Sequence, residues 1–185
     1  MRRDELDHLV RAALGILDAD SVIVAGSQAI LGSRSDAERL DAVARSTEAD
    51  LLPSDDSEEV ATLIDGTIGE LSAFHDAFGV YAQGITSGLL RLPSGWQTRL
   101  VPLDITGPQP RRAYCLSIPD VWIAKALAQR PKDWDFCVAV LAHGLVGEAE
   151  VRQLVATMDL SAQESAAIDG MIARARNLRG RGLAD

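Results

Sequence analysis

The sequence predicts an α+β protein in which a small β-sheet is flanked by helices and followed by a helical bundle. Two observations predict this class. Short apolar or alternating runs typical of strands occur between residues 21 and 116, separated by stretches with helical spacing. After residue 116 the apolar residues recur only at helical spacing. We therefore expect an α/β core over residues 1–116 and a helical region over 117–185 that packs on it.

The N-terminal part should contain two helices and two strands. Residues 4–17 carry apolar side chains at the i, i+3, i+4, i+7 positions of an amphipathic helix. The run 21–25 is typical of a buried strand, and a turn at Gly26-Ser27 should lead into a short helix near 27–32. A loop with a helical turn is expected next, before a second strand at 47–52.

The middle of the chain changes from helical to strand-like character. Ser57 is a plausible helix N-cap, because acidic residues occupy the turn after it. We expect the helix that follows to break near Asp65-Gly66, since glycine disfavours a helix interior. Residues 79–105 contain short runs with strand character, and Pro93-Ser94-Gly95 predicts a hairpin turn. Residues 114–116 could add one more short strand.

Four helices are expected in the C-terminal region. The first begins after Ser117 and ends at Arg130-Pro131, and the second, at 134–143, should be capped by Asp133. A third covers 148–158. Ser161 and Glu164 have capping-box spacing and should open the fourth, with a frayed tail from Asn177 onward.

Composition and charge narrow the class of protein. The 185 residues are 47% hydrophobic and 24% charged, which is ordinary for a globular domain. The N-terminus lacks the apolar segment of a signal peptide, and no run approaches the ~18 apolar residues of a membrane span. We expect a cytoplasmic protein with no membrane partner. The net charge of −9 argues against a broad nucleic-acid-binding surface. Cys115 and Cys137 lack metal-type spacing and are expected to be buried thiols.

The predicted site centres on the first two strands. The first strand breaks at Gly26-Ser27, where unpaired backbone N–H groups can hold a phosphate. On the second strand, Glu48 and Asp50 are two residues apart, so their side chains share one face. At about 3.3 Å of rise per residue, two such carboxylates can converge on divalent cations. The alternative is that both simply face solvent.

Four segments in this order resemble the nucleotidyltransferase fold of the DNA polymerase β type. They are Gly26-Ser27-Gln28-Ala29, Arg45-Ser46-Thr47-Glu48-Ala49-Asp50, Val101-Pro102-Leu103-Asp104, and Ile118-Pro119-Asp120-Val121 continued through Lys125 to Arg130-Pro131-Lys132-Asp133. The chain is similar to small bacterial minimal nucleotidyltransferases and to AbiEii-type proteins of toxin–antitoxin and defence systems. This resemblance implies a small mixed sheet flanked by helices.

The resemblance also implies an activity: Mg²⁺-dependent transfer of a nucleoside monophosphate from an NTP to a hydroxyl of RNA or protein. Glu48, Asp50 and Asp104 would be catalytic and would hold two Mg²⁺ ions, with Asp104 on the strand beside the other two. Gly26 and Ser27 would cradle the phosphates. A cognate toxin or antitoxin would be a possible partner. The family usually has aspartate where Glu48 stands, and the twenty residues between Ser27 and Glu48 make a long interval. Both departures favour the alternative of an inactive module that binds nucleotide or a partner protein.

Three basic residues are further candidates for phosphate binding. Lys125 and Lys132 could contact a triphosphate as point charges, or be solvated helix lysines. Arg45 could hold phosphate, or pair with Glu48 and keep it from metal. The sequence leaves these alternatives open.

Overall fold

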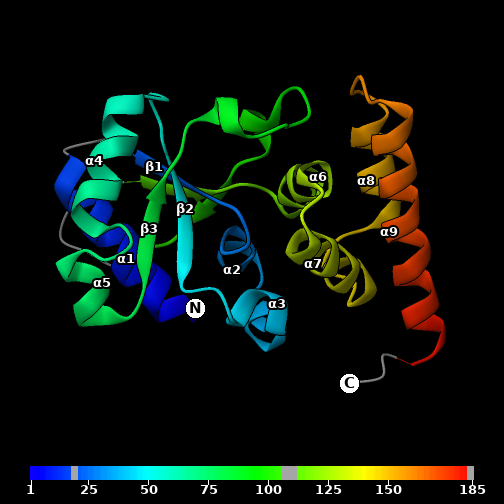
Figure 1. The fold of residues 1–185 in the computed structure, drawn as a ribbon, viewed down its shortest axis with the longest axis horizontal. Helices are drawn as coiled ribbons and strands as arrows, with labels where there is room; N and C mark the ends of the chain where they lie inside the picture. The colour runs from blue at the N-terminus through cyan, green and yellow to red at the C-terminus, as the bar shows by residue number, and fades with distance from the viewer. Residues whose placement is uncertain (18–20, 106–111, 183–185) are drawn as a thin grey trace. The chain divides into compact units, whose positions relative to one another are not determined.

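The structure, a computed structural model, describes residues 1–17, 21–105 and 112–182 (Figure 1). It divides into two compact units. Unit 1 comprises Met1–Leu90 and Arg99–Ser117, and unit 2 comprises Arg91–Thr98 and Ile118–Asp185. Unit 1 contains a mixed five-stranded sheet with helices around it, and unit 2 is helical. The predicted α+β class is confirmed, and this architecture is consistent with the nucleotidyltransferase fold.

The sheet of unit 1 has the strand order β3-β2-β1-β5-β4. Its strands are β1 (Ser21–Ala25), β2 (Glu48–Pro53), β3 (Tyr81–Gly84), β4 (Val101–Leu103) and β5 (Arg112–Cys115). β1 pairs with β2 in antiparallel and with β5 in parallel orientation. β2 pairs in parallel with β3, and β4 pairs antiparallel with β5. β1 therefore lies at the centre, which explains why its residues from Val22 to Ala25 are all buried.

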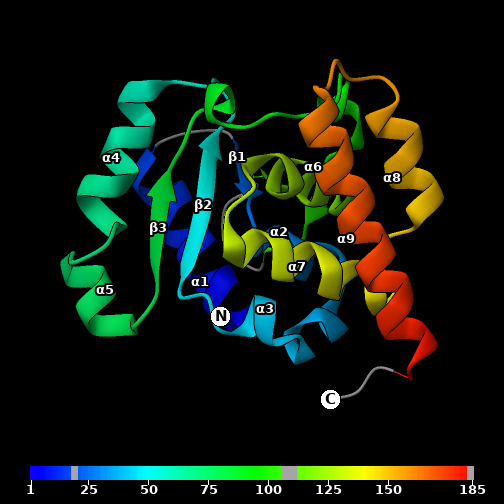
Figure 2. The same cartoon turned by 45° about the vertical axis from the view of Figure 1, so that its right-hand side comes forward.

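Helices pack around this sheet (Figure 2). They are α1 (Arg3–Leu17), α2 (Ala29–Ser33), α3 (Asp41–Ala44), α4 (Glu58–Ile68) and α5 (Ala73–Phe78), with 3-10 turns at Ser35–Arg39 and Ser87–Leu89. α1 packs on α4 and β1, and it buries the apolar stripe that its spacing predicted. α4 and α5 follow one another along β3. The Ser57 side chain accepts a hydrogen bond from Val60 N at 3.3 Å, so the predicted cap is confirmed.

Two short helices occupy the segment after Ser57, but the break between them lies four residues later than expected: α4 continues through Gly66 and is followed by Gly69, where a side chain would collide with the Asp65 carbonyl. Two expectations are wrong. Residues 93–95 form no hairpin and lead into the 3-10 turn at Trp96–Arg99, because β4 finds its partner in β5 instead. For the same reason β4 is separated from β2 by β1 and β5, so the strand before Asp104 does not lie beside the strand of Glu48 and Asp50.

Unit 2 contains α6 (Ile118–Ala128), α7 (Pro131–Ala142), α8 (Glu148–Val155) and α9 (Ala162–Gly180). α6 contacts the other three helices, and its Trp122 side chain is fully buried and donates a 2.8 Å hydrogen bond to the Cys137 carbonyl. The capping box of Ser161 and Glu164 is confirmed. Asp133 is not a cap: Pro131 starts α7, which places Asp133 within the helix. α9 extends to Gly180, beyond the fraying expected from Asn177.

Both cysteines are buried free thiols, as expected. Burial raises the pKa of Cys115 to about 12 and raises that of Cys137 as well, so neither thiol ionises near neutral pH. None of the helices in the described ranges combines the length and the apolar character needed to cross a bilayer.

Candidate functional site

The turn after β1 is the first component of the site. Gly26 has φ +60, a left-handed conformation that glycine adopts without steric cost. Backbone hydrogen bonds from Ala29 N to the Gly26 carbonyl, 3.3 Å, and from Ile30 N to the Ser27 carbonyl, 3.4 Å, close the turn. α2 has only five residues, so any phosphate affinity here depends on the turn and the Ser27 hydroxyl, with little help from a helix dipole.

Gln28 anchors this turn from the inside. Its side chain is buried, and its Nε2 donates a 3.0 Å hydrogen bond to the Val43 carbonyl in α3. The Oε1 atom of Gln28 has no hydrogen-bond partner among the described residues. This hydrogen bond therefore ties the end of the turn, directly before the buried Ala29, to α3.

β2 provides the second component, two carboxylates on one face. Ala49 and Leu51 are fully buried, whereas Glu48 and Asp50 are half-buried. This alternation is what a period of two requires, so the two acidic side chains leave the strand on the same side.

The two components meet at Asp50. Asp50 is paired with Ala25 across β1 and β2, so it lies next to the turn. A Cβ atom on residue 26 would come within 1.8 Å of the Asp50 Oδ2 atom. Gly26 is therefore needed for its conformation and for the approach of this carboxylate. The structure thus places the Asp50 carboxylate beside Gly26.

β3 contributes two side chains that sequence reasoning missed. The parallel register places Tyr81 opposite Glu48 and Gln83 opposite Asp50. The Tyr81 hydroxyl donates a 3.0 Å hydrogen bond to Glu48 Oε2. Burial, reinforced by this hydrogen bond to an anion, raises the pKa of Tyr81 to about 12, so the phenol stays protonated and orients Glu48. The run around Tyr81 had strand character, but its pairing with β2 is non-local.

Asp104 lies elsewhere on the sheet. It follows β4 at the far edge, its side chain is exposed, and its carbonyl accepts a 3.1 Å hydrogen bond from Arg3. Within the described ranges, no three His, Cys, Asp or Glu side chains are gathered as a metal site would require. The structure thus brings two of the three expected carboxylates together and leaves the third apart.

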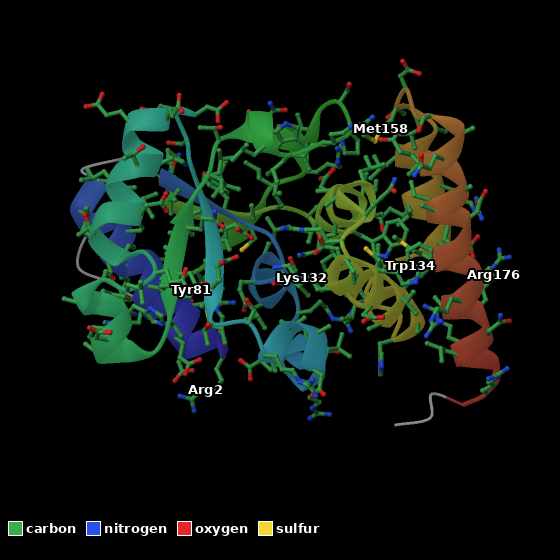
Figure 3. The ribbon with its side chains drawn as sticks, viewed as in Figure 1. Arg2, Tyr81, Lys132, Trp134, Met158 and Arg176 are labelled. Carbon is green, nitrogen blue, oxygen red and sulfur yellow. The ribbon has the colours of Figure 1, made fainter. Side chains whose placement is uncertain are left out.

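The basic candidates differ in their partners. Arg45 is exposed and pairs with Asp41 one turn earlier, so it holds neither of the β2 carboxylates in this structure. Lys132 is exposed near the start of α7 in unit 2 (Figure 3). Lys125 is only 14% exposed, and its Nζ donates a 2.9 Å hydrogen bond to Asp133. A phosphate would have to compete with Asp133 for Lys125.

Asp133 is a structural carboxylate. Its side chain is 1% exposed and bonds both Lys125 and Arg130, the latter at 2.5 Å. Burial acts to raise the pKa of Asp133, but the hydrogen bond and charge of Lys125, with those of Arg130, outweigh it and hold the pKa below its ordinary range. Lys125 also lies 4.9 Å from the centre of the Phe136 ring. These contacts stabilise the helices of unit 2.

The donor set on β2 fits magnesium. Glu48 and Asp50 offer only oxygen ligands, and Mg²⁺ is commonly bound by one or two carboxylates together with substrate phosphates. The turn at Gly26-Ser27 beside Asp50 is suited to those phosphates. The chemistry of these two carboxylates thus matches a mode of Mg²⁺ binding in which substrate phosphates supply the remaining ligands.

Comparison with known protein families gives one assignment. A family model described as nucleotidyltransferase of unknown function (DUF6036) matches residues 4–173. Comparisons with curated proteins and with solved structures gave no match. The family match covers both units and includes every candidate residue named above. The chain belongs to this nucleotidyltransferase family of unknown function.

Proposed function

We propose that this protein transfers a nucleoside monophosphate from an NTP to a hydroxyl group of another macromolecule. The observation that carries the proposal is the contact between the Gly26 turn and the Asp50 carboxylate, with Glu48 on the same face of β2. A phosphate-binding turn directly beside paired carboxylates is the arrangement that an NTP with a bound cation needs. The family assignment supports the same class of reaction.

Different residues would bind the phosphates and the metal ion. Ser27 and the backbone of the turn bind the phosphates, and Gly26 keeps the approach open. Glu48 and Asp50 would hold Mg²⁺, and Tyr81 keeps the Glu48 carboxylate oriented. Bound Mg²⁺ supplies charge neutralisation of the phosphates and of the pyrophosphate leaving group.

In the reaction, the acceptor hydroxyl oxygen forms a bond to the α-phosphorus. The bond from that phosphorus to the oxygen bridging to the β-phosphate breaks, so pyrophosphate leaves and the acceptor proton passes to solvent. Residues 46–90 contain no Lys or Arg, although they include β2 and β3. An RNA acceptor gains affinity mainly from such cations. This charge distribution favours a protein hydroxyl over RNA as the acceptor.

A transfer assay tests the proposal. The protein is incubated with each α-labelled NTP, Mg²⁺, and either total RNA or a protein extract, and the label is followed into macromolecules. We expect labelled protein, and a loss of about 100-fold or more in Asp50→Asn, because a charge that helps bind the reacting phosphates is removed. The matched control is Asp104→Asn, which should keep full activity. Equal labelling by wild type and Asp50→Asn would refute the proposal.

A second function is supported by the missing third carboxylate. Gln83, an uncharged amide, is the residue opposite Asp50, and the described residues contain no three-carboxylate group. A module that binds Mg²⁺–NTP without transferring it fits these features. Nucleotide binding without labelled product, at any acceptor, would favour this alternative, since fold alone does not fix function.

The context that we propose is a toxin–antitoxin or defence system, which rests on the resemblance described above. Induced expression in a bacterial host tests it. Wild-type protein should arrest growth, whereas Asp50→Asn at the same expression level should not. Growth arrest by both proteins would show that toxicity does not depend on the Asp50 carboxylate. Absence of arrest by both would contradict a role as a toxin.

A further inference from the structure

The segment from residue 46 to residue 90 has an unusual charge. It contains nine of the 27 acidic residues of the chain and none of the 18 Lys and Arg residues. Five of the nine are exposed on α4, α5 and the turn between them: Glu58, Glu59, Asp65, Glu70 and Asp76. Among the described residues, none of these five carboxylates is paired with a Lys or Arg. Acidic side chains on the neighbouring α1 do form such pairs, as Asp7 does with Arg3.

The same two helices expose large apolar side chains. Leu63 of α4 is 48% exposed, Leu71 in the turn 84%, and Phe78 of α5 52%. Phe78 is held in place, because its ring lies 4.7 Å from that of Phe74 and 4.4 Å from that of His8. We call the surface formed by α4, α5 and the turn between them, which carries these three apolar side chains and five carboxylates, the α4–α5 face; one of the carboxylates, Asp65, also accepts a 2.7 Å hydrogen bond from Gly84 N. The two helices that carry it pack beside β3 in unit 1 (Figure 2).

Leu71 combines exposure with backbone strain. Its φ is +62, in the left-handed region that disfavours residues with a Cβ and especially bulky ones. Asparagine or glycine would fit this turn better, and a polar side chain would suit its exposure better. The backbone conformation of Leu71 costs stability, and its exposed side chain gains little burial within the isolated fold to offset that cost. Such an outlier points to a role for the side chain outside the fold.

We infer that the α4–α5 face is a docking site for a basic amphipathic segment of another protein. Apolar side chains of such a segment would cover Leu63, Leu71 and Phe78, and its Lys or Arg residues would neutralise the unpaired carboxylates. Charge complementarity selects this occupant over an acidic or neutral one.

A second copy of the chain is a poorer occupant. Exposed arginines lie at the C-terminal end of α9, at Arg174 and, directly after the helix, at Arg181. A contact between α9 of one copy and the α4–α5 face of another would be heterologous, and such contacts propagate into open assemblies unless the rotation closes a ring. The docking site is therefore assigned to a different protein.

The test uses the full chain and a synthetic probe. The probe is a fluorescent helical peptide of about 18 residues, with leucines at i, i+3, i+4 and i+7 and lysines elsewhere. One control peptide has glutamate in place of lysine, and another has the same composition in scrambled order. Binding is measured by fluorescence anisotropy at low and high salt. We expect saturable binding of the amphipathic basic peptide only, weakened at high salt by screening.

Variants then locate the site. Leu71→Asn should weaken binding of the probe roughly tenfold or more, because it removes an apolar contact that becomes buried in the complex. The same change should raise the Tm by about 2–4 °C, because it relieves the strained backbone. Leu89→Asn is the matched control: Leu89 is 72% exposed and lies outside the face, so its replacement should leave binding unchanged.

Each other outcome overturns the inference. Equal binding of the scrambled peptide, or an equal loss in Leu89→Asn, would show non-specific attraction to acidic protein. A fall in Tm on Leu71→Asn would make Leu71 a residue that stabilises the fold. Self-association of the wild type in sedimentation velocity that disappears in Leu71→Asn would assign the face to a second copy.

Discussion

The carboxylates of β2 and the carboxylate of Asp133 show two different uses of an acidic side chain. Asp133 is 1% exposed and is neutralised by two cations of its own chain, Lys125 and Arg130. Glu48 is half-buried and receives a hydrogen bond from an uncharged phenol, and Asp50 on the same strand lies against Gly26. A carboxylate neutralised within the fold stabilises that fold. A carboxylate held by a neutral donor retains its charge for an external cation.

The largest effect on stability should come from Asp133→Asn. This change leaves Lys125 14% exposed and without its anion, so we expect a loss of about 2–4 kcal/mol in the free energy of unfolding. Urea unfolding measures it. Asp135→Asn, an exposed position on the same helix, is the control and should be nearly neutral. An unchanged free energy of unfolding in Asp133→Asn would contradict the stabilising role of this ion-paired carboxylate.

The pH dependence sharpens the same prediction. The pKa of Asp133 is lowered in the folded state, so its contribution is complete above the unfolded-state value of about 3.9 and is lost as the pH falls through the lower folded-state pKa. The gap in Tm between wild type and Asp133→Asn should therefore be full at neutral pH and should shrink below about pH 4. A constant gap would contradict the ion-pair explanation.

Gly26→Ala should have the next largest effect. A left-handed alanine costs about 1–2 kcal/mol, and its Cβ would displace the Asp50 carboxylate. We expect lower stability together with loss of Mg²⁺–NTP binding, measured by thermal unfolding and calorimetry. Gly15→Ala is the matched control, since Gly15 lies in α1 with open space around it and alanine favours a helix. Unchanged nucleotide binding in Gly26→Ala would show that the turn after β1 is not part of the nucleotide-binding site.

Tyr81→Phe should have the smallest effect on folding, about 1 kcal/mol for one hydrogen bond. Its effect on the site should be more specific. The Mg²⁺ concentration for half-maximal nucleotide binding should rise about tenfold, because Glu48 loses the donor that orients it. Tyr114→Phe on β5 is the control. If both variants required the same Mg²⁺ as wild type, Tyr81 would have no positioning role.

Local signals predicted several elements in each of the two units. The apolar run of β1 and the alternation of β2 depend only on neighbouring residues, and the caps at Ser57 and Ser161 depend on short spacings. These features required no knowledge of distant contacts. The approach of Asp50 to Gly26 is different, because it depends on the antiparallel pairing of β1 with β2.

The remaining features depend on non-local pairing. The placement of β5 between β1 and β4 moved Asp104 away from β2, and nothing in the local sequence specifies that order. Tyr81 became a partner of Glu48 only through the parallel register of β3. Asp133 has the sequence signature of a cap, yet Pro131 starts the helix earlier and burial turns the carboxylate into an ion-pair partner.

Thermal unfolding with Mg²⁺ and NTP, separately and together, tests most directly whether the turn after β1 and the carboxylates of β2 form one site. The wild-type Tm should rise only when both are present, by several degrees if the ligand is at about 100 times its Kd. This shift should vanish in Asp50→Asn and persist in Asp104→Asn. An undiminished shift in Asp50→Asn would contradict the account.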